Sequence, residues 1–173
     1  MKTELKRDEL SAGGFRFALV VSKWNDAMTS RLRDGAVEAL TASGADSAAI
    51  EVFSVPGSFE LPLACLKAAQ SGGVHAVIAL GVVIRGDTPH FDYVAGQAAS
   101  GIMQVSLTTG VPVLFGVITA DTTEQAEARC GSKADNKGYE AALSAIEMVN
   151  LLRKMGGSGD RGLIDEKVFP HVV

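Results

Sequence analysis

The 173-residue sequence has no long apolar run, only two cysteines, and no block of basic residues apart from the short segment between Lys2 and Arg7. No apolar stretch approaches the roughly 20 residues that cross a bilayer, and the N-terminal residues lack the apolar core of a signal peptide. We therefore expect a cytoplasmic protein with no membrane association. With a formal net charge of −4, the chain is also expected to have no nucleic-acid partner.

Several motifs that would indicate a metal or a nucleotide are missing. Cys65 and Cys130 lie far apart in Ala-rich segments and lack metal-ligand spacing, so they are interpreted as packing residues. His90 and Asp92 have no third ligand nearby in the sequence, which predicts no metal site. The absence of GxGxxG and GxxxxGK[ST] patterns argues against dinucleotide and P-loop nucleotide binding.

What the sequence does contain is the composition of one globular domain, 47% hydrophobic and 21% charged. Nearly continuous apolar segments alternate with helical patterns, which favours a parallel sheet covered on both faces. Strands are expected at 15–21, 50–55, 74–84 and 111–118, and helices between 28 and 44, at 61–70, at 91–109, from about 120 to 129 or 130, and at 136–155. The predicted fold class is α/β, a three-layer sandwich with a four-stranded parallel sheet flanked by helices.

Composition also divides the chain along its length. The run Gly156–Gly159 is rich in glycine and separates the last residues from the domain, while the N-terminal residues are polar. We therefore expect a flexible segment at 1–14, the folded domain at 15–155 and a C-terminal tail at 156–173.

Each expected strand is followed by a polar cluster. In an open α/β sheet ligands bind beyond the carboxyl ends of the strands, so these loops are expected to converge on one pocket. The clusters include Trp24 after the first strand, Ser58 and Glu60 after the second, residues 85–90 after the third, and 115–121 at the end of the fourth.

The segment after the third strand carries the strongest chemical signal. Gly86, Asp87 and Thr88 precede a helix whose first N–H groups lack internal partners, so the backbone and the Thr88 hydroxyl could hold a phosphate. Alternatively, Asp87 and Thr88 merely cap the helix, with Pro89 at its start. His90 is suited to proton transfer beside such a site.

Other polar or aromatic residues have two interpretations each. An exposed Trp24 ring could stack on a planar heterocycle or cover the core. Glu60 at a helix start is stabilised by the helix dipole, yet it could accept hydrogen bonds from ligand hydroxyls. Arg129 and Lys137 could be solvated surface charges, and His75 inside an apolar strand is interpreted as structural. The residues thus indicate an α/β protein that binds a phosphorylated or planar small molecule.

Taken together and in order, the loops resemble the lumazine synthase family of riboflavin biosynthesis. The matching segments are 20–25, 55–62, 81–94, 115–122, 124–126 with Arg129, and 136–142, spread over about 15–155. The resemblance implies a flavodoxin-like sheet and an enzyme, a transferase, that condenses 5-amino-6-(D-ribitylamino)uracil with 3,4-dihydroxy-2-butanone 4-phosphate. The products are 6,7-dimethyl-8-ribityllumazine, phosphate and water, and no cofactor or metal is implied.

The resemblance also implies roles for individual residues. His90 would be the catalytic proton-transfer residue. The residues implied for the ribitylaminouracil are Trp24, Ser58, Phe59, Glu60, Val82, Val83, Ile84 and Phe115, the last from a neighbouring subunit. The residues implied for the butanone phosphate are Asp87, Thr88 and Arg129, with Lys137 as an additional candidate.

Asp87 departs from the family, which usually has a small residue there. A carboxylate beside a phosphate is repelled, so a ligand role is expected only for the Asp87 backbone N–H. Its side chain is expected to cap its own helix or to pair with an arginine or lysine.

The resemblance further implies a homo-oligomer of pentamers, expected here as a 60-subunit shell, with riboflavin synthase as a candidate partner. The shell is favoured by the short, Gly-containing connector 131–138 before the last helix. Asp135 stands where glycine is common, and a left-handed backbone there would be harder for Asp to adopt.

Two other functions remain open at this point. The archaeal type of riboflavin synthase shares the fold but needs no phosphate site, and a non-catalytic flavin carrier could use a flavodoxin-like sheet. Trp24 suits both, whereas the combination of Thr88, His90 and Arg129 favours the condensation.

Overall fold

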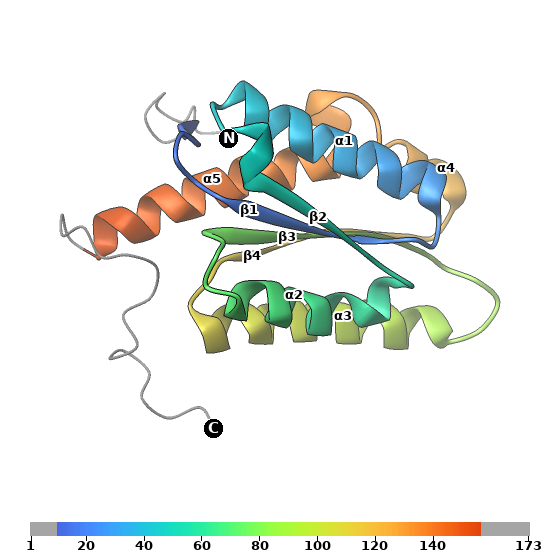
Figure 1. The fold of residues 1–173 in the computed structure, drawn as a ribbon. Coiled ribbons are helices and arrows are strands. Elements are labelled where there is room, and N and C mark those ends of the chain that lie inside the picture. Colours follow the sequence, from blue (N-terminus) through green and yellow to red (C-terminus); the bar gives the residue numbers. More distant parts are fainter. Residues whose placement is uncertain (1–9, 157–173) are drawn as a thin grey trace.

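The computed structural model describes residues 10–156, which form a four-stranded parallel sheet between two layers of helices (Figure 1). The strands are β1 (Phe17–Ser22), β2 (Ile50–Val55), β3 (Ala76–Ile84) and β4 (Val113–Ala120). All pairs are parallel, in the order β2-β1-β3-β4. The predicted α/β three-layer sandwich is therefore confirmed.

The helices lie on both faces of this sheet. They are α1 (Asp26–Ala42), α2 (Leu61–Gln70), α3 (His90–Thr109), α4 (Thr123–Glu127) and α5 (Lys137–Met155). Helices α1 and α5 cover one face and α2 and α3 the other (Figure 1). Gly110 adopts φ 71° and ends α3, and Gly44 with φ 98° follows the end of α1, as their positions in the sequence predicted.

Two expectations about the strands need correction. β4 runs two residues beyond Ile118, because Ile84 still pairs with Ala120 and the Arg85 N–H donates to the Ala120 carbonyl at 2.9 Å. β2 is not buried on both faces: its residues from Glu51 to Ser54 are exposed, and within residues 10–156 this edge strand pairs only with β1.

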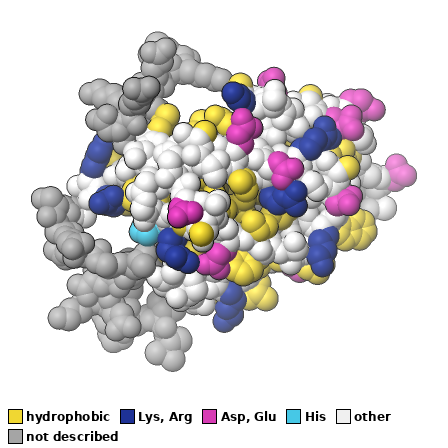
Figure 2. Space-filling view, turned by 45° about the horizontal axis from the view of Figure 1, so that its top comes forward, with side chains coloured by type: hydrophobic (Ala, Val, Ile, Leu, Met, Phe, Trp, Pro, Cys, Tyr) yellow, Lys and Arg dark blue, Asp and Glu magenta, His cyan; other side chains and the backbone are white. Residues whose placement is uncertain are grey.

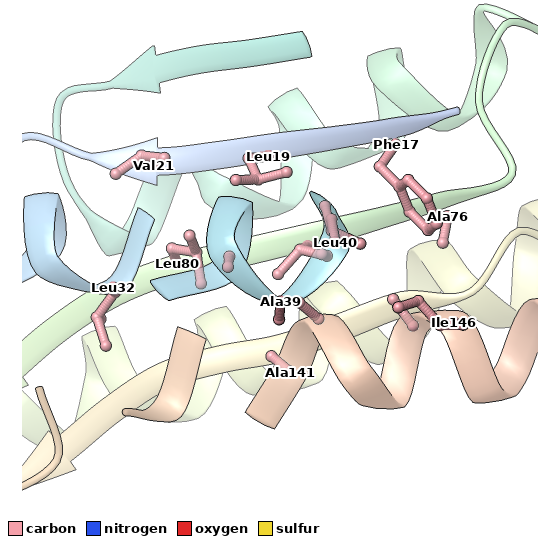
Figure 3. Packing of buried hydrophobic residues seen from close by; sticks show 14 of the residues in the cluster. Phe17, Leu19, Val21, Leu32, Ala39, Leu40, Ala76, Leu80, Ala141 and Ile146 are labelled. Atoms are coloured by element: carbon pink, nitrogen blue, oxygen red, sulfur yellow. The ribbon is translucent and has the colours of Figure 1, made fainter. Parts of the chain in front are cut away.

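The core is divided by the sheet into two apolar clusters. Figure 3 shows the cluster on the α1 and α5 side, where Leu19 and Leu80 from the sheet meet Leu40 and Ile146. Helices α1 and α5 approach each other closely at Gly138, where a Cβ would collide with the Leu32 carbonyl group. Such a contact requires glycine and fixes where α5 begins relative to α1.

Both cysteines are buried in this core and are free thiols. Burial raises the pKa of the Cys65 thiol to about 12, so this thiol stays protonated and unreactive near neutral pH. The Cys130 thiol donates to the Ala126 carbonyl at 3.3 Å. The interpretation of both as packing residues is confirmed.

His75 lies at the opposite end of the sheet from the carboxyl ends of the strands. The Nδ1 atom of the His75 ring accepts a hydrogen bond from the backbone N–H of Arg16 at 2.9 Å. The backbone N–H of His75 donates to the Arg16 carbonyl at 2.8 Å. The ring also packs beside Phe15, with centroids 5.3 Å apart. Burial and then the nearby Arg153 lower the pKa of His75. Its structural interpretation is confirmed.

This environment predicts a pH-dependent stability. Because the folded protein disfavours the His75 cation, the unfolded chain binds more protons as the pH falls through the ordinary value of 6.5. The His75 contribution to the free energy of unfolding should be complete above that value and decline below it. Unfolding measured at pH 7.5 and 5.5 should show a larger loss for the wild type than for His75→Gln. Equal losses in the two proteins would contradict this assignment.

The surface drawn in Figure 2 carries basic and acidic side chains interspersed. Across residues 10–156, no helix is long and apolar enough to cross a membrane. Ala12 is buried and its N–H donates to the Ser43 carbonyl at 2.9 Å, so part of the expected N-terminal segment packs on the domain. Residues 1–9 and 157–173, which include most of the expected tail, lie outside the described residues.

Candidate active site

A cavity of about 490 Å³ opens at the carboxyl ends of β1 and β3, between the loops that lead into α1, α2 and α3. The structure brings eight of the predicted site residues together in its lining: Trp24, Ser58, Phe59, Glu60, Val82, Val83, Ile84 and His90. Asn25, Gly57, Tyr93 and Val94 complete it. The loops after the first three strands therefore converge, as predicted, whereas the segment 115–121 at the end of the fourth strand was expected in the same pocket and does not line it.

The turn before α2 is shaped by one carboxylate. Glu60 Oε2 accepts a hydrogen bond from the Gly57 N–H at 2.9 Å, which leaves the other carboxylate oxygen without a partner among the described residues. Ser58 is 5% exposed, and its hydroxyl packs against Gly81, where a Cβ would lie 2.5 Å from Ser58 Oγ. The Ser58 hydroxyl is therefore buried against Gly81 of β3, a residue that does not line the cavity.

The start of α3 differs from the capping alternative. Pro89 occupies the N-cap position and no side chain caps the helix, so neither Asp87 nor Thr88 satisfies its first N–H groups. His90 is the first residue of the helix and lines the cavity. This position combines free backbone donors with an imidazole.

The expectation for the Asp87 side chain is wrong. Asp87 is exposed and forms no hydrogen bond or ion pair with any residue between 10 and 156. It precedes the N-cap residue, so it is badly placed to cap the helix. The nearby guanidinium of Arg85 is already engaged by Asp92 and Asp121.

Five predicted site residues do not line the cavity: Asp87, Thr88, Phe115, Arg129 and Lys137. Asp87 and Thr88 belong to the loop between Ile84 and His90, and these last two residues both line the cavity. Phe115 of β4 pairs with Ala79 of β3, which precedes the cavity-lining Val82 by three residues. Phe115 therefore lies about 10 Å from Val82 along the strands, toward their amino ends. Its own chain does not bring it to the cavity.

Arg129 lies in the segment between α4 and α5, next to Lys137, which is the first residue of α5. The Lys137 N–H donates to the Arg129 carbonyl at 2.9 Å, and Lys137 Nζ forms an ion pair with Glu140 at 3.0 Å. Arg129 is exposed. A backbone hydrogen bond thus joins these two residues, and neither of them lines the cavity of the same chain.

Comparison with known proteins matches the sequence of this chain to one family. The sequence profile of 6,7-dimethyl-8-ribityllumazine synthase covers residues 14–153. The chain is 56% identical over 146 residues to the 6,7-dimethyl-8-ribityllumazine synthase of Syntrophus aciditrophicus (strain SB), covering 84% of this chain and 95% of the relative. The enzyme of the same name from Desulfatibacillum aliphaticivorans is 56% identical over 142 residues, covering 82% and 92%.

The chain belongs to the 6,7-dimethyl-8-ribityllumazine synthase family. It is therefore a transferase of riboflavin biosynthesis. This membership favours the condensation over the two alternatives, the archaeal type of riboflavin synthase and the flavin carrier.

In this lumazine synthase, Asn25 holds the loop that carries Trp24. Asn25 adopts a left-handed backbone, with φ 59° and ψ 46°, and its Nδ2 donates to the Val82 carbonyl at 3.1 Å. Asn25 stands at the N-cap position of α1, but no side chain caps that helix. Asparagine tolerates the left-handed region, and its amide reaches across to β3 instead.

Two other lining residues could have been found from the sequence. Tyr93 and Val94 follow His90 by three and four positions in α3, so all three share one face of that helix. Helical spacing from the predicted catalytic histidine was the available signal.

The connector before α5 is a closed turn. Its positive φ, 45°, falls on Lys133 and not on Asp135, so the concern that Asp135 would need a left-handed backbone is wrong. The buried Asn136 amide fixes the turn by donating to the Arg31 and Gly131 carbonyls at 3.0 and 2.9 Å. Asn136 Oδ1 also accepts from the Tyr139 N–H and caps α5.

Proposed function

We propose that the cavity at the carboxyl edge of the sheet is the active site of this lumazine synthase. There 5-amino-6-(D-ribitylamino)uracil and 3,4-dihydroxy-2-butanone 4-phosphate would condense to 6,7-dimethyl-8-ribityllumazine, phosphate and water. The observation that carries the proposal is the lining itself, in which an apolar wall from Val82 to Ile84, the exposed Trp24 ring and the His90 imidazole meet in one cavity.

The ribitylaminouracil is proposed to occupy the part of the cavity between the strands and Trp24. Trp24 is 73% exposed, so its ring is available to stack on the pyrimidine. The ribityl hydroxyls would donate to the unpartnered oxygen of Glu60. Since the Ser58 hydroxyl faces Gly81, Ser58 and Phe59 would contribute through their backbone N–H groups at the start of the turn.

The butanone phosphate is proposed to bind at the uncapped start of α3. The Asp87 and Thr88 backbones, the Thr88 hydroxyl and the free first-turn N–H groups offer donors to the phosphate oxygens. The exposed Asp87 carboxylate can remain in solvent. Arg129 and Lys137 would supply positive charge, and Phe115 would close the pocket, all from a neighbouring subunit.

The chemistry follows from this placement. The 5-amino group of the uracil attacks the ketone and water is lost to form an imine; elimination of phosphate, ring closure and a second dehydration follow. Each step moves a proton, and His90 is placed between the two proposed binding regions to accept and return it. Holding the two reactants in line supplies a further part of the acceleration.

The proposed neighbouring subunit fits the exposed apolar side chains of the single chain. The edge strand β2 exposes Val52 and Phe53, and the outer faces of α2 and α3 expose Leu63, Met103 and Leu107. Monomeric proteins rarely leave this much apolar surface uncovered. We propose a pentamer, assembled further into a 60-subunit shell in the cytoplasm, with riboflavin synthase as its partner.

The assembly is a testable prediction. Light scattering in neutral phosphate buffer should give a particle of about sixty times the 18.0 kDa chain mass, and negative-stain images should show hollow shells. The closed connector from Gly131 to Asn136 carries no insertion that would separate pentamers. A pentamer at every concentration would exclude the shell, and a fully active monomer would exclude the shared site.

Ligand binding at the cavity can be tested through Trp24, the only tryptophan of the chain. Titration with 6,7-dimethyl-8-ribityllumazine should quench its fluorescence in a saturable manner, corrected for absorption with free tryptophan. Glu60→Gln should weaken the binding by removing a charged acceptor for the ribityl hydroxyls. Unquenched Trp24 fluorescence in a protein that binds the product would place the site elsewhere.

A further inference from the structure

Arg85 ties the loop of the proposed phosphate site to two other elements. Its Nη1 and Nη2 donate to the two carboxylate oxygens of Asp92 at 3.2 and 3.1 Å, and its Nε donates to Asp121 at 2.9 Å. The guanidinium also lies over the Phe91 ring, 4.1 Å from its centroid. We call Arg85, Phe91, Asp92 and Asp121 the Arg85 clamp; none of the four lines the cavity.

The contact between Arg85 and Asp92 holds together the two ends of residues 85–92, so that this segment forms a closed loop. Arg85 is anchored to the sheet by the hydrogen bond from its N–H to the Ala120 carbonyl. Asp92 lies in the first turn of α3, so its forked contact with Arg85 joins the two ends of residues 85–92. Thr88 and His90 lie within this closed loop.

Little else in the described structure restrains the enclosed loop. Residues 86–90 are exposed, and no side chain caps α3. A Cβ atom added at Gly86 would meet no other atom within 4 Å. A forked, charge-assisted pair fixes direction as well as distance, unlike a single hydrogen bond. The clamp is thus a directional contact that joins the start of α3 to the sheet, in addition to the packing of α3 on the turn before α2.

We propose that Arg85 is a positioning residue for the reaction, which acts through Asp92 to hold His90 and the Thr88 loop in their working geometry. The proposal rests on the roles proposed above for His90 and Thr88. It adds a residue whose side chain touches neither reactant.

Direct phosphate binding by Arg85 is the competing interpretation, and the charges oppose it. Two carboxylates face one guanidinium, so the clamp has an excess of negative charge. The hydrogen bonds from Asp92 and then Asp121 raise the pKa of Arg85, so the guanidinium remains charged and engaged with them. An anion would have to displace these partners.

The two interpretations differ in what Asp92→Asn does. For a positioning role, Arg85→Gln and Asp92→Asn should both lower kcat and raise KM for the butanone phosphate, with kcat/KM for that substrate reduced about 10- to 100-fold in Arg85→Gln. KM for the ribitylaminouracil should stay within about twofold of wild type. The double variant should be no worse than the worse single variant, because both remove the same contact. Arg85→Lys should recover part of the loss.

Arg33→Gln is the matched control, because Arg33 pairs with its neighbour Asp34 on the exposed surface of α1 and should leave the kinetics unchanged. Circular dichroism and thermal unfolding show which variants are folded. If Asp92→Asn tightens phosphate-substrate binding, or if the two single effects multiply, the positioning role is overturned. Wild-type kinetics in a folded Arg85→Gln overturn it as well.

A His90→Gln background separates this inference from the proposed catalytic role. There, Arg85→Gln should cause little further loss of kcat, because the residue that it positions is gone. A His90→Gln enzyme with wild-type turnover would reject the catalytic role of His90. The positioning role of Arg85 would then be tested only by the effect of Arg85→Gln on KM for the butanone phosphate.

Discussion

A His90→Ala variant should lose about 10- to 10⁴-fold in kcat while it keeps its fold, as expected when a proton-transfer group is removed and the other stabilising contacts remain. His90 is the only histidine among the residues that line the cavity, and it stands at the first position of α3 between the two proposed binding regions. Steady-state rates from pH 6 to 9 measure the effect.

His75→Gln provides the comparison, since His75 lies at the far end of the sheet and should affect stability but not turnover at neutral pH. Thermal unfolding of His90→Ala should match the wild type closely, because His90 is exposed and makes no side-chain hydrogen bond within the described chain. A folded His90→Ala protein with wild-type turnover across this pH range would eliminate His90 as acid or base.

An Arg129→Ala variant should raise KM for the butanone phosphate by about 10- to 100-fold, because a charge-assisted hydrogen bond is worth about 1.5–3 kcal/mol. KM for the ribitylaminouracil should change much less. The Arg129 side chain has no partner among residues 10–156, which suits the proposed binding of a ligand shared between subunits.

Steady-state kinetics with each substrate varied in turn would measure this split, with Arg33→Ala as a control for the loss of a surface cation. The oligomeric state of Arg129→Ala must be compared with that of the wild type. An unchanged KM for the butanone phosphate, with normal turnover in an intact assembly, would count against phosphate binding by Arg129.

The sequence was most informative where the structure is governed by local periodicity. Continuous apolar runs separated by helical patterns predicted the parallel sheet, and Gly110 marked the end of α3 because its left-handed backbone suits glycine. The general rule for open α/β sheets then predicted that Trp24, Glu60 and His90 would meet at one edge, although they come from different parts of the chain.

The errors arose where a side chain has a distant partner. Asn25 stands at the N-cap position of α1, where asparagine usually caps the helix, but its amide donates to the Val82 carbonyl, 57 positions away. The Asp87 carboxylate was expected to find a partner, yet Asp92 already occupies the nearby Arg85. No local sequence pattern shows which of several polar groups forms a hydrogen bond or ion pair with a side chain that is distant in the sequence.

A second kind of limit concerns residues whose proposed role depends on another subunit. Phe115, Arg129 and Lys137 enter the site only through the resemblance to lumazine synthases, and the single chain keeps them outside the cavity. Periodicity and strand order describe one chain, so they cannot bring groups from two chains together.

The most direct test of the account is to incubate the purified protein with 5-amino-6-(D-ribitylamino)uracil and 3,4-dihydroxy-2-butanone 4-phosphate and to follow product formation. The account predicts 6,7-dimethyl-8-ribityllumazine and inorganic phosphate in equal amounts, at a rate that saturates with both substrates and falls in His90→Ala. A folded, assembled protein that forms no lumazine from these substrates, or that instead converts lumazine alone to riboflavin, would contradict it.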